Sequence, residues 1–256
     1  MKIDDSIVLG YLQGSDDYEK HWLFYQISEN GEYTFERPDP MQREMVEKAL
    51  RETKQELTNF KPYNRELFSE LFPGWKDVIR DANVIISVGC PKPYDALLRR
   101  YDGKDYMIFD LIRFMEYQKA GKDMASMIRG LLTHEVTHSC IHADYPEHAM
   151  TYQDKLEYIV FDEGFAHILS FTEDVKQYNF KPVIQRYYEG ARKQLKEAFL
   201  ETDDKKKEEY LELSNCGAYW DKFAAISGKL YLADHLDEIL TIYQRGPHVM
   251  VSNILK

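Results

Sequence analysis

One helical stretch, residues 122–142, constrains this chain more than any other segment does. Near its end stands the pentapeptide His134-Glu135-Val136-Thr137-His138, and apolar residues mark one face before it: Met124, Met127, Ile128 and Leu131. Two residues four apart on an α-helix lie about 6 Å apart along the axis and on the same face. Both imidazoles can therefore bind one metal ion, and the rest of the chain must fold so that a further ligand reaches this face.

Glu135 follows the first histidine directly, and its position indicates a different role from that of the histidines. Its carboxylate lies beside the pair, where it can hold and deprotonate a metal-bound water rather than bind the metal. The motif thus predicts a metal-dependent hydrolase with Glu135 as its general base. The alternative is a pair of solvated helical histidines that binds no ion.

A second segment, Asp162-Glu163-Gly164-Phe165-Ala166, lies on another helical pattern. Two histidines from one helix and a carboxylate from a second form a ligand set of catalytic zinc, with water in the fourth position. We expect the apolar face around Glu163 to pack against the motif helix, with Gly164 allowing a close approach. The sequence therefore predicts one Zn²⁺ per chain, bound by His134, His138 and Glu163.

Three other residues near these segments compete for the same ion. His142 lies about 12 Å along the helix axis and about 80° around it from His134, so the two are not expected to share one ion. Asp162 is turned by about 100° from Glu163, so both carboxylates cannot face the metal. His167 lies one turn after Glu163, and it either lines the pocket or is a hydrogen-bonded structural histidine.

A hydrolase of this kind also needs a hydrogen-bond donor for the oxyanion of its tetrahedral intermediate. Three possible donors, Tyr219, Tyr231 and His235, lie in a small-residue segment, 217–240, that we expect to be one helix. We take Tyr219 as the catalytic donor because it opens that helix beside Gly217. Core packing is the alternative role for each of the three.

Composition and charge exclude several classes of protein. Hydrophobic residues make up 44% of the chain and aromatic residues 14%, which is typical of a globular protein. The net charge of −11 disfavours binding to nucleic acid or anionic membranes, so we expect neither as a partner. No run of about 18 apolar residues could span a bilayer, and the acidic start of the chain does not resemble a signal peptide. We therefore expect a cytoplasmic protein.

The remaining patterns predict an α+β fold that is mainly helical. Residues 84–88 form a β-branched run, and Asp102-Gly103 joins segments 96–101 and 104–109, which is a strong hairpin signal. A small sheet or hairpin thus precedes the motif helix, and helices make up the C-terminal part. We expect residues 1–82 to be a helical N-terminal region packed on the catalytic domain, and residues 83–256 to be that domain.

Prolines, glycines and apolar spacing predict the other elements. Expected helices lie at 16–27, at 41–59, within 60–81, from about 152 past Ala166, at 178–200 with an interruption near Pro182, and at 217–240. Expected non-helical features are a turn at Asn30-Gly31, a linker at 114–119, His148 on a loop surface, and a break at Gly246-Pro247.

A hairpin sheet, then an HExxH helix, then a helix with an EGFA-type carboxylate resembles the gluzincins, the zincin metallopeptidases whose third ligand is a glutamate. Over residues 83–240 the chain is similar to small bacterial predicted Zn-dependent proteases of the peptidase MA clan. The resemblance implies a zincin-like domain in which His134, His138 and Glu163 bind zinc and Glu135 is the base.

Two features depart from the thermolysin-like gluzincins. Those enzymes have an aspartate four residues after the ligand glutamate, where it orients a zinc-bound histidine, whereas this chain has His167 there. The orienting role is then left to Asp162 or to a backbone carbonyl. The segment between His138 and Glu163 is also longer than in thermolysin-like or aminopeptidase-type members, so neither subfamily is a good match.

These expectations combine into a zinc metallopeptidase that acts on a peptide or protein. Glu135 would take a proton from zinc-bound water, the hydroxide would attack a carbonyl polarised by the metal, and Glu135 would pass the proton to the leaving amine. The strand at 104–109 is expected to bind an extended substrate by edge pairing. Two alternatives stay open: a zinc-dependent hydrolase of a non-peptide amide, and a zincin-fold protein that binds a partner without catalysis.

Overall fold

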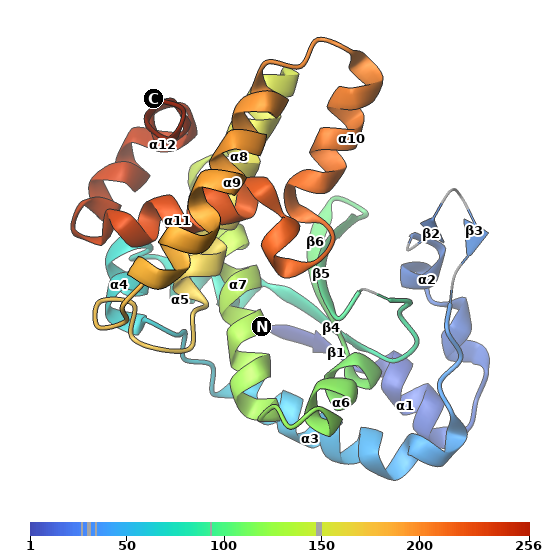
Figure 1. Ribbon diagram of the computed structural model, residues 1–256. Coiled ribbons are helices and arrows are strands. Elements are labelled where there is room, and N and C mark those ends of the chain that lie inside the picture. The colour runs from blue at the N-terminus through green and yellow to red at the C-terminus, as the bar shows by residue number, and fades with distance from the viewer. Residues whose placement is uncertain (27, 30–31, 34, 93, 147–149) are drawn as a thin grey trace. The chain divides into compact units, whose positions relative to one another are not determined.

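The computed structural model describes residues 1–26, 28–29, 32–33, 35–92, 94–146 and 150–256 (Figure 1). The chain divides into two compact units, one made of Met1–Lys61 and Lys76–Glu135, the other of Pro62–Trp75 and Val136–Lys256. Strands on both sides of residue 82, the boundary expected from the sequence, pair in one sheet. The expected turn at Asn30-Gly31 and the loop residue His148 lie outside the described residues.

The first unit contains a four-stranded sheet with the strand order β1-β4-β6-β5. Its strands are β1 (Lys2–Asp4), β4 (Asn83–Ser87), β5 (Ala96–Tyr101) and β6 (Lys104–Asp110). β1, β4 and β6 run parallel, whereas β5 and β6 form the predicted antiparallel hairpin. Asp102 and Gly103 both have positive φ angles, 47° and 71°, as a tight two-residue hairpin turn requires. With its helices, the chain has the predicted α+β, mainly helical class.

The position of β6 within the sheet contradicts the expected substrate pairing at 104–109. β4 pairs with one edge of this strand and β5 with the other. Since both edges are paired from Tyr106 to Phe109, this described part of β6 has no free edge at which an extended peptide could add. The outer strands of this sheet are β1 and β5.

The helices of the N-terminal half agree with the sequence in part. They are α1 (Ser6–Gln13), α2 (Trp22–Gln26), α3 (Arg43–Thr58), α4 (Arg65–Leu71) and α5 (Trp75–Asp81), and two short strands, β2 (Ser28–Glu29) and β3 (Glu32–Tyr33), lie between α2 and α3. The helices expected at 41–59 and within 60–81 are confirmed. The helix expected at 16–27 is instead a 3₁₀ turn followed by α2. In the first unit α1 contacts β4, and α3 contacts both α1 and α6 (Leu111–Lys119).

Helix α6 occupies the segment that we expected to be a linker. Asp110 is its N-cap, and its Oδ1 accepts hydrogen bonds from the backbone N–H groups of Ile112 (2.9 Å) and Arg113 (3.2 Å). Its Oδ2 accepts a third bond from the backbone N–H of Cys90, at 2.8 Å. Burial raises the pKa of the Asp110 carboxyl to about 6 despite these bonds. Cys90, which lies 20 residues earlier in the chain, thus helps to hold the N-cap residue of α6 in place. Local sequence spacing could not reveal this contact.

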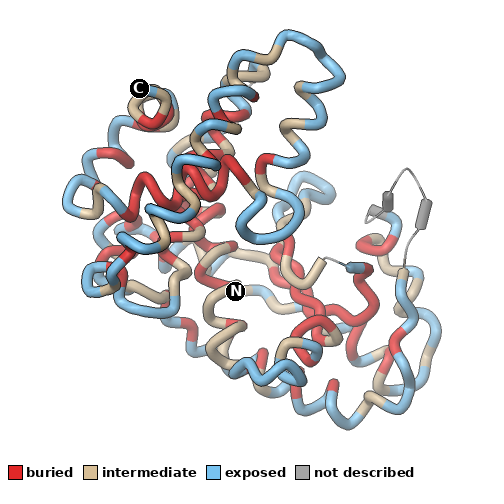
Figure 2. The backbone as a smooth tube through the Cα atoms, in the orientation of Figure 1, coloured by how far each residue is buried: buried red, intermediate tan, exposed pale blue. Residues whose placement is uncertain are grey.

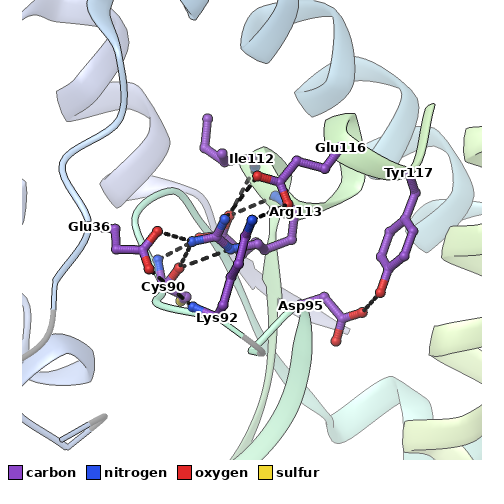
Figure 3. Close-up of polar contacts among 9 residues, drawn as sticks. Glu36, Cys90, Lys92, Asp95, Ile112, Arg113, Glu116 and Tyr117 are labelled. Atoms are coloured by element: carbon purple, nitrogen blue, oxygen red, sulfur yellow. Dashed lines mark hydrogen bonds and ion pairs between the residues drawn. The ribbon is translucent and has the colours of Figure 1, made fainter. Parts of the chain in front are cut away.

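Arg113 joins the start of α6 to the loop that follows β4 (Figure 3). Its guanidinium is buried and donates two hydrogen bonds to the carbonyl oxygen of Cys90, at 2.9 and 3.2 Å. It also forms ion pairs with Glu36 and Glu116. A buried arginine with several acceptors is well satisfied, so this network stabilises the first unit.

The second unit is a helical assembly around two central helices. Its helices are α4, the end of α7 (Met124–Asp144), α8 (Tyr152–Leu169), α9 (Lys181–Phe199), α10 (Asp204–Asn215), α11 (Phe223–Asp234) and α12 (Ile239–Ile254). α11 packs on α8 and α9, and α12 packs on α8. Every residue of 223–233 is buried, so α11 is a core helix, as Figure 2 shows. None of the helices in the described part of the chain is long and apolar enough to cross a membrane.

Three boundaries in this unit differ from expectation. The predicted 217–240 helix is a 3₁₀ turn (Tyr219–Asp221), helix α11 and a second 3₁₀ turn (Leu236–Glu238). Pro182 is the second residue of α9 and does not interrupt it, because proline suits the first turn of a helix. Gly246, with φ at 78°, kinks α12 before Pro247, so the expected break is a kink between two helical parts.

Two glycines let α8 and α11 cross at backbone distance. A Cβ atom on Gly228 would lie 2.0 Å from the carbonyl oxygen of Val160, and one on Gly164 would lie 2.9 Å from the Cα of Gly228. No side chain fits at either position without moving a backbone. The close approach expected of Gly164 is therefore made to α11, not to the motif helix.

Candidate metal centre

Helix α7 carries the whole HExxH pentapeptide without interruption, as the sequence predicts. Asp123 caps its start, where the Asp123 Oδ2 accepts a hydrogen bond from the backbone N–H of Ser126 at 2.7 Å. His138 and Glu135 are buried and His134 is half-buried. Regular helical geometry holds His134 one turn before His138 on the same face of α7.

Asp162 on α8 lies against His138. Its Oδ2 is 2.8 Å from the Nδ1 of His138, with the imidazole turned away from the line of an ideal hydrogen bond. The same oxygen is 3.4 Å from the Nε2 of His142. Burial alone would raise the pKa of the Asp162 carboxyl, but the two neighbouring histidines outweigh it and hold the pKa below its usual value.

A carboxylate at Nδ1 is the arrangement found around histidines that bind metals. It favours the tautomer with hydrogen on Nδ1, which leaves the lone pair of Nε2 for an ion. The other Asp162 oxygen, Oδ1, is buried and makes no hydrogen bond within the described residues. Such an atom is costly to bury, so Asp162 is poorly explained as a purely structural residue.

His138, His142 and Asp162 together are one group that could itself hold an ion, since one potential ligand atom from each lies within 4.8 Å of the others. The helical spacing argues only against an ion shared by His142 and His134, which lie eight residues apart. It does not address an ion shared by His142 and His138, which lie four residues apart. In the structure Asp162 stands between His138 and His142 as the partner of both.

Glu163 is the next residue on α8, and its side chain is 15% exposed. Burial raises the pKa of its carboxyl, although His138 lies close enough for its charge to act in the opposite direction. Its Oε1 accepts a hydrogen bond from the Asn215 side chain at 3.3 Å, and its Oε2 lies 3.5 Å from the Nε2 of His167. Both contacts are long for a buried carboxylate, and a cation nearby would stabilise its charged form.

Tyr219, the predicted oxyanion donor, lies near Glu163, but in a different element from the one expected from the sequence. Tyr219 lies in the 3₁₀ turn before α11, so the expectation that it opens the helix is wrong. Its ring packs edge-on against His167, with centroids 5.3 Å apart, and its hydroxyl accepts a hydrogen bond from Lys229 at 2.6 Å. Tyr219 therefore lies next to the Glu163–His167 pair.

The two other donor candidates form a packing pair. The rings of Tyr231 and His235 stack with centroids 4.3 Å apart, and a ring nitrogen of His235 lies 2.9 Å from the carbonyl oxygen of Tyr231. These contacts satisfy His235 within its own helix end. Tyr219 is thus the one of the three that contacts the neighbours of Glu163.

Sequence reasoning missed Lys229 and Asn215 as members of this region. A signal for Lys229 was present, because it is the one charged residue in the apolar run Phe223–Ala233, where a core helix should carry none. Asn215 ends α10 and offered no comparable signal.

No protein-family model, no curated protein and no solved structure matches this chain, and the chemical meaning of the centre therefore comes from its own residues.

Proposed function

We propose that the protein is a zinc metallopeptidase in which His134, His138 and Glu163 bind one Zn²⁺ and Glu135 is the general base. The observation that carries this proposal is the buried Asp162 carboxylate 2.8 Å from the Nδ1 of His138. Metal-bound histidines usually have such a partner on their second nitrogen, and it is one of the two orienting groups expected from the sequence.

The donor set suits zinc better than other common cations. Two imidazoles and one carboxylate are the protein ligands of a catalytic zinc site, whereas magnesium and calcium prefer oxygen ligands throughout. Glu163 supplies the carboxylate from α8, next to the residue that contacts His138. His142 remains outside this set, because its Nε2 faces Asp162.

The residues of the chain would divide the chemistry as follows. Zinc, when bound, supplies a Lewis acid that acidifies water and polarises a substrate carbonyl. Glu135 accepts a proton from the attacking water and returns it to the leaving amine. Asp162 holds His138 in one orientation, and the Tyr219 hydroxyl donates a hydrogen bond to the oxygen that gains negative charge.

Metal analysis together with cleavage of an unbiased peptide library tests the proposal. We expect about one zinc per purified chain, and peptide cleavage that stops on chelation. Glu135→Gln should abolish cleavage and keep the zinc, because the amide retains the shape of the side chain but cannot accept a proton at neutral pH.

The matched control is Glu157→Gln. Glu157 is also a buried glutamate, but it lies on α8 and pairs with His248. It should cleave the library at the wild-type rate. Cleavage by Glu135→Gln at that same rate would refute the mechanism. Zinc bound without any peptide cleavage would favour a non-peptide amide or a binding role instead.

A further inference from the structure

Lys229 is a buried lysine with an unusual set of neighbours. It is 5% exposed, and its Nζ lies 5.0 Å from the ring centroid of Phe171 and 5.2 Å from that of Tyr219. Its one hydrogen-bond acceptor within the described residues is the Tyr219 hydroxyl, and no carboxylate there pairs with it. Burying an ammonium without an anion is costly, and two aromatic faces offset only part of that cost.

The direction of this hydrogen bond determines what Tyr219 can do. An ammonium group only donates, so the Tyr219 oxygen is the acceptor and its own hydrogen must point elsewhere. No acceptor for that hydrogen is found in the part of the chain that the structure describes, and Tyr219 is 39% exposed. Partial burial raises the pKa of Tyr219 to about 12, so the phenol stays protonated near neutral pH.

The crossing of α8 and α11 brings the Lys229–Tyr219 pair close to Glu163, the predicted zinc ligand on α8. Gly228, directly before Lys229, touches Gly164, directly after Glu163. The Tyr219 ring packs against His167, whose Nε2 is 3.5 Å from the Glu163 Oε2. The free phenolic hydrogen therefore belongs to a ring that adjoins the Glu163–His167 pair.

We infer that Lys229 is a positioning residue that fixes the Tyr219 hydroxyl as a one-way donor toward an oxygen of the substrate. With the ammonium on its lone pair, the hydroxyl cannot turn to accept, and the nearby positive charge strengthens it as a donor to developing negative charge. The class of ligand is a carbonyl oxygen of an amide that becomes an oxyanion. The identity of this ligand rests on the proposed function, whereas the Lys229–Tyr219 bond does not.

The bond itself can be tested on metal-free protein without any activity. NMR of ¹³C-labelled lysine side chains follows the titration of Lys229, which is identified by its low pKa and, where that variant folds, by the signal lost in Lys229→Met. Burial lowers the pKa of Lys229 to about 8, so its titration is accessible. Tyr219→Phe should shift this titration to lower pH by removing the acceptor that stabilises the ammonium. Tyr231→Phe, the matched control on the same helix, should not shift it.

Kinetics with a cleaved peptide test the positioning role. Tyr219→Phe should lower kcat about 100-fold with little change in KM, as expected for loss of one oxyanion donor. Lys229→Met should lower kcat about tenfold, and adding it to Tyr219→Phe should cause no further loss, because Lys229 acts through that hydroxyl. Losses that multiply in the double variant, or a change in KM alone, would overturn the inference.

These results remain separable from a failure of the proposed function. A chain that binds no zinc and cleaves no peptide overturns the zinc peptidase and the substrate role of the pair, while the lysine titration still shows whether the bond exists. An unchanged titration in Tyr219→Phe overturns the inference even if the protein is a zinc peptidase. Tyr219→Phe removes one oxygen from a partly exposed residue, so it remains informative if Lys229→Met does not fold.

Discussion

At the residue scale, the contact between Asp162 and His138 is the observation that favours the proposed metal centre over a chance pair of helical histidines. An isolated HExxH sequence on a solvated helix needs no buried carboxylate, whereas here Asp162 is 8% exposed and reaches the Nδ1 of His138. A desolvated carboxylate is costly without polar partners, and His138 and His142 both lie against its Oδ2. The neighbouring Glu163 keeps its own partners, so the two carboxylates have distinct roles.

The distinction between these two carboxylates leads to a prediction for metal affinity. Glu163→Ala should weaken zinc binding by at least about tenfold because it removes a ligand, and Asp162→Asn should weaken it by about tenfold because the orienting charge is lost. His142→Ala should change it by no more than a few-fold. Competition with a chromogenic chelator measures all three affinities. A loss in His142→Ala as large as in Glu163→Ala would instead place the ion on the His138, His142 and Asp162 group.

At the element scale, the crossing of α8 and α11 sets the distance between Glu163 on α8 and Lys229 on α11, both in the second unit. Gly164 and Gly228 meet where any side chain would collide with backbone. Glu163 and Lys229 flank this contact, one on each helix. The small-residue run of α11 predicts tight packing from sequence, but its partner helix could only be known from the fold.

Gly228→Ala should therefore destabilise the protein by at least about 2 kcal/mol, because its methyl group would lie 2.0 Å from the Val160 carbonyl oxygen and force the helices apart. Urea denaturation measures the loss in the free energy of unfolding. Gly190→Ala is the matched control, since a Cβ atom there meets nothing within 4 Å, and it should stabilise α9 by up to about 1 kcal/mol. Equal stability of the two variants would mean that the crossing is looser than described.

At the scale of the whole molecule, a bound zinc ion should couple α7 and α8 to the stability of the fold. An ion that binds only the folded chain adds about 4 kcal/mol at a free concentration 1,000 times its Kd, which corresponds to a rise of about 8–16 °C in the unfolding midpoint. Calorimetry with and without a chelator measures this rise. His138→Ala should show none, and a rise of the same size in that variant would indicate zinc bound elsewhere.

The sequence by itself determined the features that depend on neighbouring residues. The spacing of His134, Glu135 and His138 on α7 follows from helix periodicity, and the β5–β6 hairpin follows from the turn chemistry of Asp102-Gly103. The general α+β class also follows, because it depends on the order of such local patterns.

Only the tertiary structure decided which distant groups meet. The contact of Asp162 with His138, the pairing of β6 with β4, and the contact of Gly164 with Gly228 join separate segments of the chain, and the bond from Lys229 to Tyr219 links a helix to the turn before it. Local propensity carries no information on these pairings, because each is set by how whole helices and strands bury their apolar faces against one another.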